Sequence, residues 1–209
     1  MLLVIYMLGL VFASYLAGSI SFAVIVSKVM LLPSPYSYGS ENPGATNVLR
    51  TGNKLAAFFT LLGDMAKGFV AVNFLPLYIL PDMVLSAHAS VATGLALIGV
   101  LLGHVLPIFH AFRGGKGVAT AAGGLLALDV RIGFSVLSTW LIVSLVFRYS
   151  SLAAICSSLV TPFIVFWLTQ QLELTYLVSV ASAILLLRHK GNIVNLLNGT
   201  ESKIGKKGA

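Results

Sequence analysis

The chain has 209 residues, of which 58% are hydrophobic and only 9% are charged, whereas an ordinary soluble domain carries about 25% charged residues. So few charged side chains exclude a water-soluble globule and indicate a helical protein that crosses a membrane several times. The formal net charge is +7, but the Lys and Arg residues are scattered between apolar runs, which argues against a nucleic-acid-binding stripe. A single cysteine, Cys156, excludes an internal disulfide.

Apolar runs predict the helices, and three of them contain no charged side chain at all (1–27, 83–112 and 149–172). Each is long enough to cross a hydrocarbon layer of about 30 Å. The first run has no basic region before it, so we expect no cleaved signal peptide. The expected fold is all-α, with a single domain over residues 1–209 and seven spans, at 3–28, 55–80, 84–105, 117–129, 131–147, 150–169 and 173–188.

The distribution of cations predicts the orientation. Lys28 follows the first run, so the positive-inside rule places the amino terminus outside and the carboxyl terminus inside. Of the thirteen Lys and Arg residues, all then fall inside except Arg131, which falls outside, and Lys67, which lies in a span. The stretch 118–147 is one long span or two short ones separated at 129–131. We favour two short helices, packed as half-spans, because a single span would put the basic tail outside.

Three polar segments, 31–54, 103–120 and 188–207, all fall on this inner side. The first is dense in small residues and hydrogen-bond donors, and it ends in a fixed cation, which is typical of a phosphate cradle. The alternative is a polar connector with an Asn-Pro-Gly turn. Glu41 opposes anion binding unless it points away. The candidate binding residues here are Gly39, Ser40, Asn42, Gly44, Thr46, Asn47 and Arg50.

The second segment contains Gly114, Gly115, Lys116 and Gly117 directly before an apolar helix. Free N–H groups, the positive end of a helix and an ammonium would meet there, which predicts a second anion site. It is not a Walker A loop, because a glycine follows the lysine where Ser or Thr is required. The alternative is a positive-inside anchor with flexible glycines.

The third segment begins Arg188-His189-Lys190, and Asn192 follows His189 at a spacing of three, so both would share a face if the last span continues by one turn. They could meet a polar substrate there, or the basic residues could simply stop transfer. The stretch Arg148-Tyr149-Ser150-Ser151 begins another helix on the inner side, where it could add a cation and hydroxyls or equally anchor the helix at the membrane interface.

Two further observations limit the chemistry. Asp64 and Lys67 lie three apart within a span, where we favour a structural ion pair over catalysis. The histidines lack an aspartate five residues later, so the His-x4-Asp pattern of many glycerolipid acyltransferases is absent. The few carboxylates are dispersed, so we expect no metal site.

In these segments, with Gly18-Ser19, Gly103-His104, Pro107-Ile108-Phe109 and Gly199-Thr200-Glu201, the sequence resembles the bacterial acyl-phosphate:glycerol-3-phosphate acyltransferase (PlsY) family over nearly its whole length. The resemblance implies a seven-span inner-membrane enzyme with its active site facing the cytosol. Such an enzyme transfers a fatty acyl group from acyl phosphate to the 1-hydroxyl of glycerol 3-phosphate, giving lysophosphatidic acid and phosphate. It also implies a monomer that works at membrane lipid without cofactor, metal or nucleic acid.

The resemblance assigns roles residue by residue. Ser40 and the backbone of 39–47 would hold phosphate, Arg50 and Lys116 would clamp its charge, and His189 and Asn192 would orient the substrates. These five side chains are the expected catalytic residues. The expected substrate-binding residues are Gly39, Asn42, Gly44, Thr46, Asn47, Gly114, Gly115, Gly117 and Ser151. The chain departs from the family at Ser21, often Pro, at Glu41, often Gly, and at Gly191 and Asn195 in a tail that is usually more charged.

Acyl phosphate is already activated, so positioning and charge stabilisation could suffice without a protein nucleophile. The expected mechanism is direct attack by the substrate hydroxyl, with an oxygen of the donor phosphate taking the proton. The rival is a transporter of a phosphorylated metabolite, which would bind near the bilayer midplane between repeats. No repeat is visible in the sequence.

Overall fold

The computed structural model describes residues 1–204, and within them the chain forms helices and no strands. The all-α expectation is confirmed. The elements are α1 (Leu2–Gly18), α2 (Phe22–Val29), α3 (Ala45–Leu49), α4 (Lys54–Asn73), α5 (Leu75–Ile79), α6 (Asp82–Val105), the 3-10 turn η1 (Ile108–His110), α7 (Val118–Leu128), α8 (Val130–Phe147), α9 (Ser150–Thr169), α10 (Leu172–Arg188) and α11 (Lys190–Leu197).

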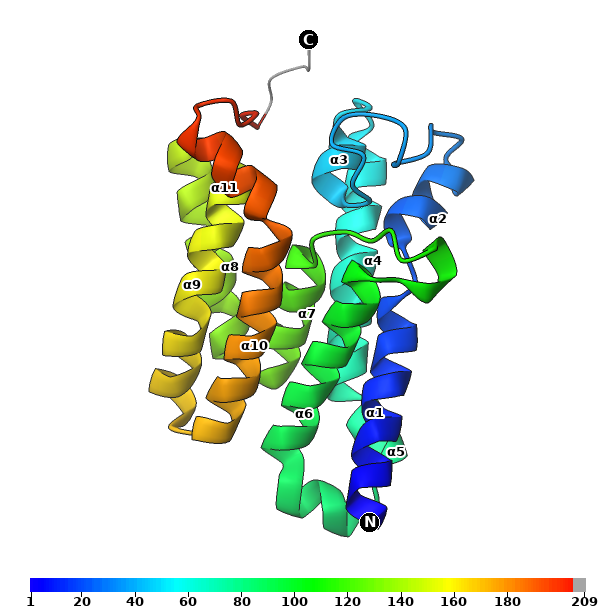
Figure 1. The fold of residues 1–209 in the computed structure, drawn as a ribbon, viewed down its shortest axis with the longest axis vertical. Helices are drawn as coiled ribbons and strands as arrows, with labels where there is room; N and C mark the ends of the chain where they lie inside the picture. Colours follow the sequence, from blue (N-terminus) through cyan, green and yellow to red (C-terminus); the bar gives the residue numbers. More distant parts are fainter. Residues whose placement is uncertain (205–209) are drawn as a thin grey trace.

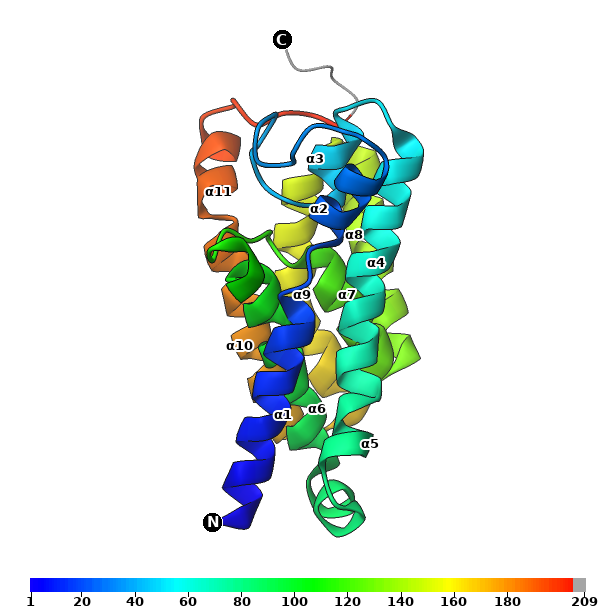
Figure 2. The ribbon, with the colours of Figure 1, turned by 90° about the vertical axis from the view of Figure 1, so that its right-hand side faces the viewer.

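The helices stand side by side in one bundle (Figure 1). In this view α8, α9 and α10 lie on one side, α1, α2 and α4 lie on the other, and α7 runs between them. The chain begins at one end of the bundle, whereas α2, α3 and α11 lie at the opposite end (Figure 2). The first and third polar segments therefore occupy the same end of the molecule.

Helix lengths refine the expected spans. Five helical stretches of the described chain are long and apolar enough to cross a membrane, and the pair α10–α11, bent by 57°, would be a sixth. The count of seven spans stays a prediction. The stretch 118–147 does form two helices, but only α7 is short. Its 11 residues reach about 16 Å at 1.5 Å per residue, whereas α8 has 18 residues and is a candidate span by itself.

Two expected helices are broken. The run 3–28 is interrupted between Gly18 and Phe22, and the run 55–80 is divided between α4 and α5. At the first break the Ser21 side chain accepts a hydrogen bond from the Val24 N–H and thereby caps α2, as serine does at helix N-termini. Apolar periodicity alone does not reveal such a cap.

A buried ion pair satisfies the backbone at the first break. Lys67 Nζ lies 2.9 Å from Asp64 Oδ1 and donates a hydrogen bond of 2.6 Å to the Ile20 carbonyl oxygen. A carbonyl freed inside a bilayer has no water to bond, so a protein donor is required. Asp64 and Lys67 thus form the predicted structural ion pair, and its second task is to complete the end of α1.

Glycines let neighbouring helices approach closely. A side chain on Gly123 of α7 would overlap the main chain of Met65 on α4, and one on Gly68 of α4 would overlap the Thr120 carbonyl of α7. Gly18 and Gly103 have the same role between α1 and α6. Small residues are typical of helix contacts within membranes, where packing replaces the hydrophobic effect as the driving force.

We expect Gly123→Ala to lower the free energy of unfolding by about 1–3 kcal/mol, because the added methyl group pushes α7 away from α4. Thermal unfolding of the purified protein in detergent measures the effect. Gly9→Ala is the matched control, because a Cβ on Gly9 meets no atom within 4 Å. Equal unfolding temperatures for the two variants would contradict the close packing of α4 and α7.

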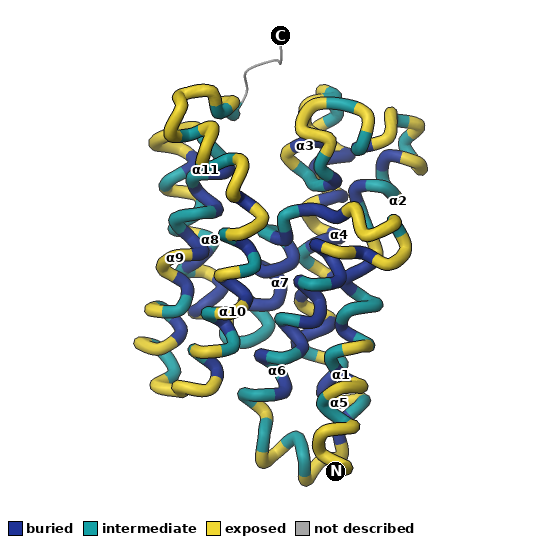
Figure 3. The backbone as a smooth tube through the Cα atoms, viewed as in Figure 1, coloured by how far each residue is buried: buried dark blue, intermediate teal, exposed yellow. Residues whose placement is uncertain are grey.

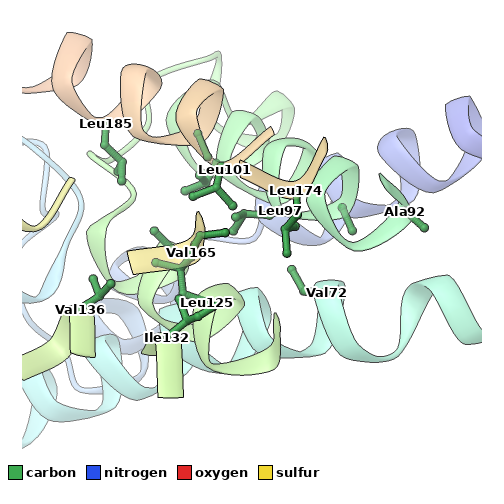
Figure 4. Close-up of a cluster of buried hydrophobic side chains, with 14 of the residues drawn as sticks. Val72, Ala92, Leu97, Leu101, Leu125, Ile132, Val136, Val165, Leu174 and Leu185 are labelled. Atoms are coloured by element: carbon green, nitrogen blue, oxygen red, sulfur yellow. The ribbon is translucent and has the colours of Figure 1, made fainter. Parts of the chain in front are cut away.

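The core lies in the middle of the bundle, where side chains of α6, α7 and α10 meet those of α1, α4, α8 and α9. Exposure increases toward the ends and outer faces of the bundle (Figure 3). The buried side chains of the core include Leu97, Leu101, Leu125, Ile132, Val136, Val165, Leu174 and Leu185 (Figure 4). The outer faces carry large apolar side chains, among them Phe163 and Trp167 on α9, both 77% exposed. Such faces suit contact with lipid tails and confirm the membrane class that composition indicated.

Candidate active site

All three polar segments line one cavity of about 460 Å³. Helices α4, α6, α7, α8, α9 and α10 line the cavity. Residues of α3 and α11 line it at the end of the bundle where these two helices lie (Figure 1), which we call its mouth. Of the predicted site residues, the cavity is lined by Ser40, Asn42, Gly44, Thr46, Asn47, Arg50, Lys116, Gly117, Ser151, His189 and Asn192. Gly39, Gly114 and Gly115 are not part of the lining.

The first loop is held in shape by Asn47. The Asn47 side-chain oxygen accepts a hydrogen bond of 3.0 Å from the Ser40 N–H, and its amide group donates to the carbonyls of Pro35 and Tyr38. The side chain is 3% exposed. These bonds fold the loop around Asn47 and hold the Ser40 peptide in place, and binding of substrate by Asn47, which also lines the cavity, stays a prediction.

Backbone conformation explains two residues of this loop. Gly39 has φ of +60°, and a Cβ there would overlap the Asn47 side chain. Glu41 has φ of +52°, a left-handed conformation that costs little only for glycine. Glu41 is exposed and does not line the cavity, so its charge points away from the proposed anion site.

The second loop presents Lys116 to the cavity. Its Nζ donates a hydrogen bond of 2.7 Å to Asn192 Oδ1, which joins the second segment to the third. Gly117 precedes α7 with φ of +88°, a conformation that favours glycine. The first N–H groups of α7 are free of helical partners, and they add the positive end of the helix dipole beside the ammonium.

The third segment bends at His189. Helix α10 ends at Arg188, where the last expected span also ends, and the axis turns by 57° between α10 and α11. His189 Nδ1 lies 2.7 Å from the Leu185 carbonyl oxygen. Because a carbonyl only accepts, Nδ1 carries the proton and Nε2 is the nitrogen left for a ligand. The bend still leaves both His189 and Asn192 in the cavity lining.

Glu201 is a cavity residue that the sequence analysis left out of the site. Its Oε1 accepts hydrogen bonds from Ser151 Oγ at 2.6 Å and from Asn192 Nδ2 at 2.8 Å. The next residue, Ser202, accepts a bond of 2.8 Å from Arg50. The segment after α11 therefore connects the first loop, α9 and α11. The motif Gly199-Thr200-Glu201 was the available signal in the sequence. A carboxylate repels phosphate, so residue type alone argued against placing Glu201 in a phosphate site.

The sequence analysis also did not predict a buried polar cluster around His104 or the apolar wall of the cavity. His104 Nδ1 lies 3.1 Å from Thr120 Oγ1 and 3.7 Å from Asp64 Oδ1, so a buried polar cluster borders the cavity below Lys116. The remaining wall is formed by apolar and small side chains, including Leu61, Met65, Leu137, Trp140, Ala154, Ser157, Ser158, Val178 and Ala181. The cavity thus has a polar mouth and a mostly apolar interior.

The charges at the mouth alter the Lys116 ammonium. Its burial lowers the pKa of Lys116 below the usual lysine range, and the positive charges of Arg50 and Arg188 lower it further. The Glu201 carboxylate acts in the opposite direction. Cations that disfavour one another leave a local excess of positive charge, which a bound anion would neutralise.

These features define a multi-pass helical membrane protein whose cavity joins a cationic, polar mouth to a mostly apolar interior. The family model named glycerol-3-phosphate acyltransferase matches residues 8–199. The chain belongs to this family, which includes PlsY, and it is an acyltransferase. The resemblance found in the sequence is confirmed, and the family assignment favours the enzyme over the transporter.

Curated relatives and solved structures agree. The chain is 52% identical to a glycerol-3-phosphate acyltransferase of Cupriavidus metallidurans over 205 residues, which cover 96% of this chain and 98% of that protein. It is 51% identical to one of Nitrosomonas eutropha, covering 94% and 96%. A crystal structure of PlsY, an integral membrane glycerol 3-phosphate acyltransferase in its glycerol 3-phosphate form, superposes with a TM-score of 0.84 at 30% identity, covering 95% and 96%. The lysophosphatidic acid form gives 0.83.

Proposed function

We propose that this enzyme transfers a fatty acyl group from acyl phosphate to the 1-hydroxyl of glycerol 3-phosphate at the cytosolic face of the bacterial inner membrane. The products are lysophosphatidic acid and inorganic phosphate. The observation that carries the proposal is the joining of cationic loops and an apolar interior in one cavity. Relatives named glycerol-3-phosphate acyltransferase support glycerol 3-phosphate as the acceptor.

The polar mouth fits two phosphate groups. Arg50 and Ser40 approach from the first loop, and Lys116 with the start of α7 approaches from the second. Arginine forms bidentate bonds to phosphate, and free amides at a helix start bind anions. In the proposed complex Asn192 shifts from Lys116 to a substrate oxygen, which leaves the ammonium to meet the phosphate charge.

The interior fits the acyl chain. Ala154, Ser157 and Ser158 on α9 and Ala181 and Ser182 on α10 all line the cavity, and small side chains there leave room for a hydrocarbon. The hydroxyls of Ser157 and Ser158 donate to carbonyls of their own helix, Ser157 to Ala153 at 2.7 Å and Ser158 to Ala154 at 2.8 Å. Their donors are therefore satisfied without a ligand, which makes this wall compatible with an apolar chain.

The proposed step is direct transfer. The acceptor hydroxyl oxygen bonds to the acyl carbonyl carbon, the bond from that carbon to the phosphate oxygen breaks, and the hydroxyl proton passes to the leaving phosphate. Ser151 beside Glu201 is the hydroxyl that could instead form an acyl-enzyme. The mixed anhydride needs no such intermediate, because phosphate is already a good leaving group and positioning with charge stabilisation supplies the catalysis.

The test uses purified protein in detergent with palmitoyl phosphate and glycerol 3-phosphate. We expect lysophosphatidic acid and inorganic phosphate in equal amounts, and no release of phosphate at a comparable rate without the acceptor. Intact-protein mass spectrometry after incubation with palmitoyl phosphate alone checks the direct step. An added palmitoyl group that disappears in Ser151→Ala would refute direct transfer, and absence of product with this donor would refute the donor assignment.

A further inference from the structure

The Gly114–Gly115 loop is held from two sides. On one side it packs against the end of α6, where the Gly115 N–H donates a hydrogen bond of 3.1 Å to the His104 carbonyl oxygen. A Cβ on Gly114 would overlap the carbonyls of His104 and Val105, and one on Gly115 would overlap the His104 ring. On the other side lies α10, whose last residue is Arg188.

Arg188 is bonded to both glycines. Its NH2 group donates to the Gly114 carbonyl at 3.0 Å, and its Nε donates to the Gly115 carbonyl at 3.3 Å. These bonds hold two successive peptide groups in a fixed orientation. A guanidinium carries several donors in a rigid plane, so one side chain can bridge two carbonyls, which a lysine ammonium on its flexible stem does poorly.

Peptide geometry links these carbonyls to the site. A trans peptide group is planar, and its C=O and N–H point in opposite directions. With the Gly114 carbonyl held by Arg188, the Gly115 N–H points to His104, as observed. With the Gly115 carbonyl also held, the Lys116 N–H points away from Arg188. Within residues 1–204 this N–H has no main-chain acceptor.

We propose that Arg188 is a positioning residue that sets the orientation of the Lys116 peptide and side chain for phosphate. The inference rests on the proposed function. The bend after Arg188 adds a second constraint, because α11 then brings Asn192 to within 2.7 Å of Lys116 Nζ. The α10–α11 junction thereby holds both the backbone and the side chain at Lys116, so the basic end of the last span does more than stop transfer.

The test compares Arg188→Ala, Arg188→Lys and the control Lys190→Ala. Lys190 is exposed two residues further on and lies outside the cavity lining, so its loss removes the same charge without the loop bonds. Two measurements are made on each protein. One is the concentration of inorganic phosphate that gives half-maximal protection against thermal unfolding. The other is kcat and KM for palmitoyl phosphate and glycerol 3-phosphate.

We expect Arg188→Ala to lower kcat/KM by about 10- to 100-fold, the loss typical of residues that orient a ligand-binding group through hydrogen bonds. The same variant should need a higher phosphate concentration for half-maximal protection against thermal unfolding. The unfolding temperature without phosphate should stay close to that of the wild type. Arg188→Lys should recover only part of both losses, and Lys190→Ala should match the wild type. Wild-type phosphate protection in Arg188→Ala would overturn the proposal.

Arg188→Lys decides the matter if Arg188→Ala does not accumulate as folded protein. Wild-type phosphate protection and kinetics in Arg188→Lys would show that only charge is needed, which would overturn the bridging role. The phosphate measurement needs neither acyl donor nor acceptor. If wild-type protein makes no product from palmitoyl phosphate while Arg188→Lys still loses phosphate protection, the proposed donor fails and the role of Arg188 stands.

Discussion

Replacement of Lys116 by Met is expected to lower turnover about a hundredfold or more, comparable to the loss of one donor from an oxyanion hole. The ammonium is the cation of the second loop that reaches the cavity, and methionine keeps its length and apolar stem without the charge. Stability should remain unchanged or increase, because the variant no longer buries part of a charged group. Phosphate release and thermal unfolding in detergent measure the two effects.

The pH dependence follows from the same group. Because the pKa of Lys116 is lowered in the folded protein, the folded state binds this proton less tightly than the unfolded state. The protonated form therefore costs stability at neutral pH, and the cost is relieved as the pH rises through the folded pKa. Activity should decline over that same interval, below the range of an ordinary lysine, while stability at this group improves.

Lys28→Met is the matched control. Lys28 is exposed at the same end of the bundle, in the last turn of α2, and does not line the cavity. We expect wild-type turnover in this variant. Wild-type turnover in Lys116→Met as well would return Lys116 to the role of a positive-inside anchor.

Lys67→Met is expected to lower the free energy of unfolding by about 3–5 kcal/mol, the range for leaving one partner of a buried ion pair uncompensated. Asp64 would lose its counter-ion with 3% of its side chain exposed, and the Ile20 carbonyl would lose its donor. The measurement is the unfolding temperature in detergent, together with the yield of monodisperse protein.

The double variant Asp64→Asn with Lys67→Met separates charge from geometry. It removes both charges, so we expect it to be more stable than Lys67→Met, although the Ile20 carbonyl remains without its donor. If the single and double variants unfold at the same temperature, the loss comes from the helix break rather than from the buried charge, and the ion-pair explanation is wrong.

The sequence predicted the positions of the long helices, because apolar runs and the Asp129 boundary are local signals, but it did not predict the short helices α3 and α11. It did not predict the break between α1 and α2 or the bend at His189. Both depend on partners distant in the chain. Lys67 on α4 donates a hydrogen bond to the Ile20 carbonyl oxygen, and the apolar pattern within 3–28 contains no sign of that bond. Span count and orientation stay predictions from cation placement.

The site was predictable as three segments on one side, but not in its internal division of labour. The Asn47 amide is a group that could bind phosphate, yet in the structure it bonds the Ser40 N–H and the Pro35 carbonyl of its own loop. Gly114 and Gly115 have the pattern of an anion loop, yet their carbonyls face Arg188. Glu201 belongs to the site because Ser151 and Asn192 both donate hydrogen bonds to its carboxylate, and the sequence does not reveal these contacts. Residue type predicts which hydrogen bonds a group can form, whereas the neighbouring residues in the fold determine which of them it does form.

The short length of α7 has a consequence for how the donor arrives. Helix α7 has 11 residues and begins below the ends of the surrounding helices (Figure 1), and on the proposed function its positive end would meet the phosphate of a donor held in the leaflet. On the proposed function, acyl phosphate would then be captured by diffusion within the leaflet, without leaving it. The reaction rate in liposomes would accordingly follow the surface density of donor among the lipids rather than the amount of donor per volume of buffer.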